Sequence, residues 1–220
     1  MTAERRYVWD VPVRLFHWAI VVLLGFSWWC AESERMDWHY KSGLTLCALV
    51  LFRIVWGFAG STTARFADFV RGPRAVWDQF RQRGKPRTEP FGHSPIGGWS
   101  VLALITLLVV QIGTGLFAVD LDGLESGPLS YLVDFDQGRL AADLHEISFN
   151  VLLAISAIHV LAILFYRLAW RRDLLGPMIS GYRKDSREEQ DTIRAPWWRL
   201  VLAVALALAV TWTISIGLRF

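Results

Sequence analysis

Two of the five histidines in the chain, His145 and His159, stand fourteen residues apart in one apolar stretch. In an α-helix, fourteen residues turn the chain to within about 40° of its starting direction and advance it by about 21 Å. Both imidazoles are therefore expected to face the same neighbour at two depths. Imidazole binds metals and exchanges protons near neutral pH, so the spacing could serve either chemistry.

The composition indicates an integral membrane protein. Of the 220 residues 54% are hydrophobic and twelve are tryptophan, and the mean hydropathy of +0.34 is too high for an ordinary soluble domain. Five stretches approach the ~20 residues that a helix needs to cross a bilayer. They are residues 15–31, 42–64, 96–119, 147–166 and 200–218, of which the second contains Arg53. No A-x-A cleavage site follows the first stretch, so we expect a membrane span there rather than a signal peptide.

The distribution of lysine and arginine predicts the orientation of these spans. With a cytoplasmic N-terminus, 19 of the 23 basic residues lie on the cytoplasmic side and four lie outside. Ten acidic residues lie on each side, so the net charge is −6 outside and +9 inside. The positive-inside rule therefore predicts a multi-pass protein of the bacterial inner membrane with its N-terminus in the cytoplasm.

Two connections between the spans are long enough to have a role of their own. Residues 61–98 are expected to form a cytoplasmic loop, with a short amphipathic helix over residues 75–82 at the membrane interface. Residues 120–141 are expected to form an outer loop, which is long for a helix bundle and is therefore a candidate docking surface.

Four histidines fall into pairs of equal depth in this topology. His39 and His145 lie near the outer ends of their spans, and His17 and His159 lie near the cytoplasmic ends. A haem iron with histidine on both faces needs one imidazole from each of two facing helices at one depth. The pairs therefore predict two haem sites, whereas zinc needs ligands that converge on one point. The alternative is that individual histidines are hydrogen-bonded core residues.

Two arginines share helix faces with the predicted ligands. Arg53 follows His39 by fourteen residues, and Arg14 precedes His17 by less than one turn. Either side chain could pair with a haem propionate or extend its charge to the cytoplasmic surface, and for Arg14 the second interpretation is favoured. His93, before the third span, is interpreted as a structural loop residue, with proton exchange at a quinone site as the alternative.

Five segments of the chain resemble the bacterial cytochrome b561 family, which includes the b-type subunits of nickel–iron hydrogenases. They are WDVPVRLFHW, HYKSG, FRIVWGFAGSTTARFADFVRGP, GHSPIGGWSVLALITLLVVQIGTGLF and LHEISFNVLLAISAIH. The resemblance extends over about residues 7–181. The resemblance implies a four-helix bundle with two b haems, and places His17, His39, His145 and His159 at the ligand positions. It also implies electron exchange with the membrane quinone pool at one end and a redox partner at the other.

We therefore expect an all-α integral membrane protein, a four-helix haem-binding bundle with an extra C-terminal transmembrane helix. Residues 1–181 form the di-haem domain, and residues 182–220 form a cytoplasmic linker and the fifth helix. The expected partners are lipid, quinone, and a periplasmic c-type cytochrome or another redox subunit, which the acidic outer face would attract if it is cationic. No nucleic acid partner is expected.

Two alternative functions remain open from the sequence. Some relatives in the resembled family oxidise superoxide and pass the electron to quinone, although a negative outer face disfavours an anionic substrate. A transporter or proton channel with histidine relays belongs to another class, but the spans contain no interior Asp or Glu. Whether the chain is an oxidoreductase by itself or the cytochrome subunit of a larger redox complex is also left open.

Overall fold

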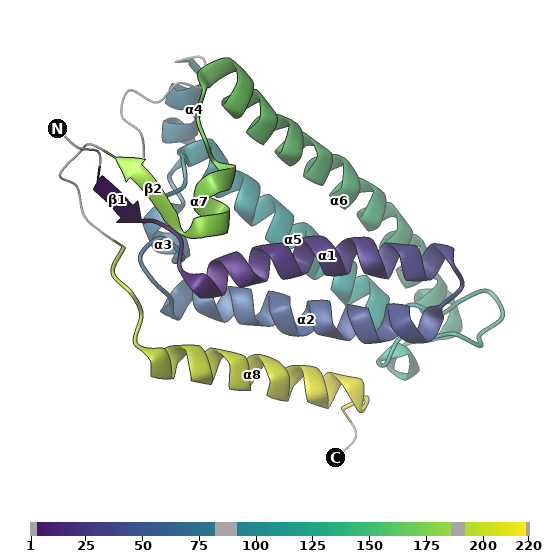
Figure 1. Ribbon diagram of the computed structural model, residues 1–220. Helices are drawn as coiled ribbons and strands as arrows, with labels where there is room; N and C mark the ends of the chain where they lie inside the picture. The colour runs from purple at the N-terminus through teal and green to yellow at the C-terminus, as the bar shows by residue number, and fades with distance from the viewer. Residues whose placement is uncertain (1–3, 82–91, 186–191, 219–220) are drawn as a thin grey trace. The chain divides into compact units, whose positions relative to one another are not determined.

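The computed structural model describes residues 4–81, 92–185 and 192–218, and its five long helices confirm the predicted spans (Figure 1). Each is long and apolar enough to cross a membrane. Large apolar side chains on these helices remain exposed, as expected of a surface that faces lipid. The helices are α1 (Val11–Glu32), α2 (Met36–Ala59), α5 (Pro95–Phe117), α6 (Phe135–Trp170) and α8 (Trp197–Ser215).

Helix α6 begins at Phe135, several residues before the apolar stretch that predicts it. The helix starts with a capping box, in which Asp134 accepts a hydrogen bond from the backbone N–H of Gln137 at 2.8 Å. The Gln137 side chain accepts one in return from the backbone N–H of Asp134 at 3.3 Å. Reciprocal bonds of this kind satisfy the free N–H groups of a first helical turn. Because the first turns of α6 are polar, hydropathy alone does not indicate them.

The remaining elements are short, and only one of them was predicted. Helix α4 (Pro73–Arg81) matches the amphipathic helix expected at residues 75–82, of which residue 82 lies outside the described ranges. Strands β1 (Glu4–Tyr7) and β2 (Tyr182–Asp185) pair antiparallel, with Tyr7 opposite Tyr182. The unpredicted helical pieces are α3 (Phe66–Phe69), the single 3₁₀ turn η1 (Ser130–Leu132) and α7 (Leu175–Ser180).

The chain divides into two compact units, and the long helices pass from one into the other. Unit 1 comprises residues 1–16, 53–103 and 157–201. Unit 2 comprises residues 17–52, 104–156 and 202–220. The two strands and the short helices α3, α4 and α7 belong to unit 1, whereas η1 belongs to unit 2.

A buried carboxylate organises unit 1. Asp10 accepts a hydrogen bond from the backbone N–H of Val13 at 2.8 Å, and so caps the start of α1. Its other oxygen accepts bonds from the indole N–H of Trp56 at 2.9 Å and the hydroxyl of Ser61 at 2.5 Å. One aspartate therefore ties the start of α1 to the end of α2.

Two hydrogen bonds connect the C-terminal end of α8 to other elements of unit 2. The hydroxyl of Tyr40 on α2 donates to the carbonyl of Ser215 on α8 at 3.4 Å, and Tyr131 of η1 donates to the carbonyl of Gly217. The buried residues of α8 in this unit lie four residues apart, so they share one helix face. They are Ala203, Ala207 and Thr211.

Candidate functional site

The side chains of His39 and His145 lie together in unit 2. His39 stands in the first turn of α2 and His145 stands on α6. Their ring centres are 6.0 Å apart, and the ring planes are nearly perpendicular, at 81°. With metal–nitrogen bonds of about 2 Å and a ring nitrogen about 1 Å from the ring centre, two axial imidazoles on one ion stand about 6 Å apart. The spacing of this pair therefore suits one metal ion between the rings.

Both imidazoles are oriented by backbone carbonyl groups. The Nδ1 of His39 donates to the carbonyl of Ser27 on α1 at 2.9 Å. The Nδ1 of His145 donates to the carbonyl of Gln111 on α5 at 2.8 Å. A carbonyl only accepts, so the proton of each ring resides on Nδ1 and the lone pair resides on Nε2. This is the arrangement of a metal-binding histidine, whose second nitrogen is fixed by a hydrogen bond.

Gln111 also contacts the nitrogen that carries the lone pair. Its side-chain amide lies 3.0 Å from Nε2 of His145 and donates to it. The amide oxygen accepts a hydrogen bond from the hydroxyl of Ser148, which is buried on α6. A metal at Nε2 would replace the amide as the partner of that lone pair. Sequence reasoning missed Gln111, Ser148 and Ser27, and the only signal for them was the presence of polar residues in otherwise apolar spans.

Gly115 on α5 provides the space for the His145 ring. A Cβ atom at this position would lie 2.8 Å from Cε1 and 3.0 Å from Nδ1 of His145. Such contacts are closer than carbon and nitrogen atoms approach without displacement. The ring and the helix backbone therefore meet directly because residue 115 has no side chain.

We expect Gly115→Ala to displace the His145 ring and to lower metal or cofactor occupancy at this pair several-fold. Gly113→Ala is the matched control, since a Cβ at residue 113 on the same helix meets no atom within 4 Å. The measurement is the optical spectrum of each purified variant, with the amount of bound chromophore per chain. Equal loss in the two variants would assign the effect to α5 in general rather than to the contact with His145.

The other two predicted ligands lie in different units. His17 is the first residue of unit 2 and stands on α1, with its ring 5.0 Å from that of Trp18. His159 belongs to unit 1 and stands on α6. Helix α6 is uninterrupted between His145 and His159, as the fourteen-residue spacing assumes. The pairing of His17 with His159 stays a prediction.

Arg53 is buried in unit 1, with 2% of its surface exposed. Its guanidinium lies 5.0 Å from the ring centre of Phe66, and its Nη1 has no hydrogen-bond partner among the described residues. Asp10 is the acidic group that influences it, but both oxygens of Asp10 already accept bonds from other groups. A buried guanidinium with a free N–H is suited to bind an anionic oxygen.

Arg14 lies on α1 in unit 1, close to Gly181. A Cβ atom at residue 181 would collide with Nη1 of Arg14, and Gly181 has a φ of +87° that favours glycine. The Nε atom of Arg14 is buried and has no hydrogen-bond partner among the described residues. Arg14 can therefore also offer an N–H to an anion.

His93 packs between two aromatic rings of unit 1. Its ring centre lies 4.5 Å from that of Trp9 and 4.3 Å from that of Phe69. Burial, together with the charges of Arg53 and His159, lowers the pKa of His93 to about 3. The imidazole is therefore neutral at pH 7, and its contacts are those of a packing residue.

Comparison with known proteins gives consistent matches over most of the chain. One relative is described as a probable Ni/Fe-hydrogenase B-type cytochrome subunit of Rhodobacter capsulatus. It is 24% identical over 219 residues, and the match covers 83% of this chain and 84% of the relative. A probable Ni/Fe-hydrogenase 1 B-type cytochrome subunit of Escherichia coli K12 is 24% identical over 211 residues, covering 80% and 90%. No solved structure gives a significant match.

The chain also matches a protein family over most of its length. Residues 8–181 match the family described as prokaryotic cytochrome b561. This range contains α1, α2, α5 and α6, with both histidines of the 6.0 Å pair, and it ends before α8. From its long apolar helices and the extent of this match, we conclude that the chain belongs to the prokaryotic cytochrome b561 family.

Proposed function

We propose that this protein carries electrons across the membrane, between the quinone pool and a periplasmic redox partner, through two b haems. The observation that carries the proposal is the pair His39 and His145, with ring centres 6.0 Å apart. The Nδ1 atom of each ring donates to a backbone carbonyl, so Nε2 is the nitrogen that could bind a metal, which at His145 would replace the amide of Gln111. Membership of a b-type cytochrome family supports haem b as the cofactor.

The residues at this pair fit a haem. The imidazoles of His39 and His145, from different helices, would hold the iron, and membrane-spanning helices would supply apolar surroundings. A b haem bound there would supply a one-electron redox couple, and the ligands and local dielectric would set its potential. The chain itself fixes the ring orientations through Ser27 and Gln111. We propose His17 and His159 as the corresponding pair on the cytoplasmic side.

Arg53 and Arg14 are proposed to bind the propionates of the cytoplasmic haem. Both offer a buried N–H without a hydrogen-bond partner among the described residues. Arg53 does not extend its guanidinium to the surface, because only 2% of the residue is exposed. A carboxylate beside it would neutralise a charge that is otherwise costly to bury.

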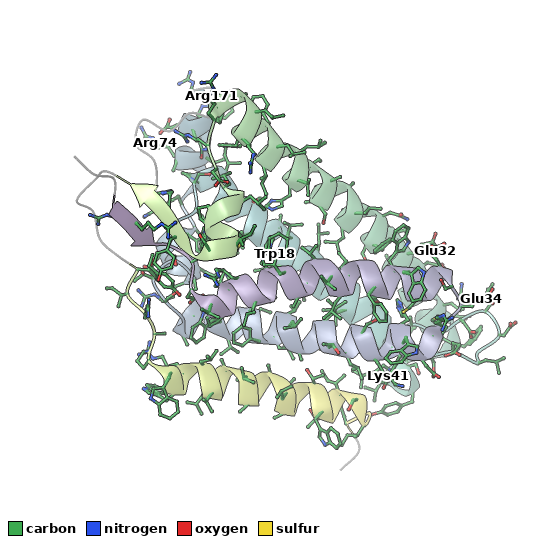
Figure 2. All side chains as sticks on the ribbon, in the orientation of Figure 1. Trp18, Glu32, Glu34, Lys41, Arg74 and Arg171 are labelled. Carbon is green, nitrogen blue, oxygen red and sulfur yellow. The ribbon has the colours of Figure 1, made fainter. Side chains whose placement is uncertain are left out.

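The orientation is proposed from the positive-inside rule. The end of α1, the first turn of α2 and the segment that follows α5 carry the acidic outer charge, whereas unit 1 carries most of the arginines. Figure 2 labels examples of each group, Glu32 and Glu34 in unit 2 and Arg74 and Arg171 in unit 1. Unit 1 is accordingly proposed to lie on the cytoplasmic side of the inner membrane, together with the N-terminus.

The organisation of the chain follows from this proposal. Residues 1–181 serve as the di-haem domain, and residues 182–220 serve as a cytoplasmic linker and fifth transmembrane helix. The family match ends at residue 181, which supports this division. The strand β2, just after that boundary, pairs with β1 and would fasten the linker to the start of the domain.

The periplasmic partner is proposed to be a c-type cytochrome or another redox subunit. The relatives are described as subunits of Ni/Fe-hydrogenases, which supports a larger redox complex as the setting. Superoxide is disfavoured as the outer substrate, because the outer side is acidic and the two residues that could form a local basic funnel, Lys41 and Arg139, both contact other side chains. Arg139 lies 3.3 Å from Asp143, and Lys41 lies 5.0 Å from the ring centre of Trp38.

Two measurements test the proposed function. A reduced-minus-oxidised spectrum with a pyridine haemochrome assay should give about two haem b per chain and a low-spin spectrum. In vesicles, a quinol should reduce the bound haem, and external ferricytochrome c should reoxidise it. A ratio of haem b to chain near zero in folded protein would overturn the proposal. It would favour the alternative function, a transporter or proton channel with histidine relays.

A further inference from the structure

A short hairpin with a defined backbone connects α5 to η1 in unit 2. Residues Val119 and Ser126 form an antiparallel bridge. Within it the N–H of Asp120 donates to the carbonyl of Glu125 at 3.0 Å. The turn closes where the N–H of Gly123 donates to the carbonyl of Asp120 at 3.3 Å, and Gly123 has a φ of +72°. We call residues 119–126 the outer hairpin.

The base of the outer hairpin is fixed to the two flanking helices. The N–H of Val119 donates to the carbonyl of Gly138 at 3.1 Å, and Nη1 of Arg139 donates to the carbonyl of Val119 at 2.9 Å. Just after the hairpin, the N–H of Gly127 donates to the carbonyl of Ala118 at 2.8 Å. The hairpin is therefore a fixed projection from α5 and α6 and not a free loop.

Two leucines at the tip of the outer hairpin are exposed and do not pack in the core of unit 2. Leu121 is 78% exposed and Leu124 is 85% exposed. Figure 1 shows the loop that follows α5, in teal, extending past the ends of α1 and α2. The tip therefore points away from the stretch of those helices that crosses the bilayer, so lipid does not account for its apolar side chains. Exposed apolar side chains held on a fixed projection are typical of contact sites.

The residues around the tip of the outer hairpin are acidic, which favours a cationic protein as the partner that covers it. Asp120, Asp122 and Glu125 belong to the hairpin, and residues 119–138 contain no lysine or arginine. Glu32 and Glu34, labelled in Figure 2, add exposed acidic side chains at the end of α1 in the same unit. Such a surface attracts a cationic protein and repels the headgroups of anionic lipids.

The base of the outer hairpin lies close to the candidate haem ligand. A Cβ at Gly127 would collide with the carbonyl oxygen of Gly115, so the chain just beyond the hairpin packs against that part of α5. Gly115 in turn contacts the ring of His145. A protein that covers the base of the hairpin would therefore stand next to the part of α5 that contacts the His145 ring.

We propose that the outer hairpin is the docking site for a basic, soluble redox protein, with Leu121 and Leu124 as its apolar anchors. The proposal rests on the proposed function, because it identifies where the periplasmic partner binds. On docking, one electron passes between the outer site and the metal centre of the partner, so one of them is oxidised as the other is reduced. The acidic residues attract the partner, and the two leucines hold it.

Binding of a basic c-type cytochrome to the purified, haem-loaded protein in nanodiscs tests this proposal. The double variant Leu121→Ser/Leu124→Ser should raise the Kd about tenfold at low salt, since anchors at the centre of an interface dominate its affinity. The matched control is Leu168→Ser, a leucine on α6 that is also 78% exposed but belongs to unit 1. An unchanged Kd in the double variant, or equal weakening in the control, would overturn the proposal.

Two more measurements test the role of charge and the position of the tip relative to lipid. The variant Asp120→Asn/Asp122→Asn/Glu125→Gln should flatten the salt dependence of the Kd, and an unchanged dependence would contradict the role of charge. A fluorophore on Leu121→Cys should shift to the blue when the cytochrome is added. Quenching by brominated lipid before that addition would assign the tip to the membrane and overturn the proposal.

Haem content distinguishes failure of this proposal from failure of the proposed function. Every variant should retain about two haem b per chain, because the hairpin supplies no ligand. A ratio near two with unchanged binding rejects the docking site alone. A ratio near zero in the unmodified protein rejects the electron-transfer function, and the docking site with it.

Discussion

Replacing His145 with alanine is expected to leave one haem b per chain in place of two. The imidazole is one of two rings at the outer pair, and its Nδ1 is already bound to the carbonyl of Gln111. Loss of an axial ligand removes both an iron–nitrogen bond and the orientation that the protein supplies. His39→Ala should lose the same haem, since its ring stands 6.0 Å from that of His145. Haemochrome assays and redox titration would show a single remaining couple.

The opposite pair provides the reciprocal test. His17→Ala and His159→Ala should each lose the other haem and retain the outer one, so the two sets of variants should leave different spectra and potentials. His93→Ala is the control, because this imidazole packs against Trp9 and Phe69 and serves no predicted pair. Loss of one haem in His93→Ala, or identical spectra for His17→Ala and His145→Ala, would contradict the pairing.

The sequence predicts that His39 and His145 form a pair, because the depth of each residue in the membrane follows from its position in a predicted span. Knowing that α2 and α6 cross the membrane is enough to give His39 and His145 the same depth. The same reasoning cannot identify Gln111 or Ser27, because they act through hydrogen bonds between helices whose rotation the sequence leaves open. A polar residue in a span is a weak signal, since the hydroxyl of Thr45 on α2, for example, donates to the carbonyl of Lys41 on the same helix at 2.8 Å.

Short elements were missed for a different reason. The strands β1 and β2 are four residues each and are paired across more than 170 residues of sequence, so no local pattern indicates them. The outer hairpin was expected only as a long loop, because the alternation of apolar and acidic residues from Val119 to Asp122 is only four residues long and ends at Gly123. In both cases the structure depends on long-range backbone hydrogen bonds, which hydropathy does not report.

Asp10→Ala is expected to lower the free energy of unfolding by about 1–3 kcal/mol for each buried donor that it leaves without a partner. Asp10 caps α1 through Val13 and accepts bonds from Trp56 and Ser61. Its loss would leave buried donors without a partner and would remove the acidic group that influences buried Arg53. Chemical unfolding in mild detergent would measure the change. Asp68→Ala is the control in the same unit, since Asp68 forms an exposed ion pair with Arg65 at 2.7 Å and should change stability by less than about 1 kcal/mol.

A double-mutant cycle separates the two contributions of Asp10. If the uncompensated charge of Arg53 dominates the loss, Asp10→Ala/Arg53→Leu should be more stable than Asp10→Ala alone. If the hydrogen bonds to Trp56 and Ser61 dominate, the second substitution should restore nothing. Equal stability of Asp10→Ala and the unmodified protein would contradict both. The cycle also bears on the cofactor, because a guanidinium that needs Asp10 for its charge balance in the haem-free chain should need it less when a propionate is bound.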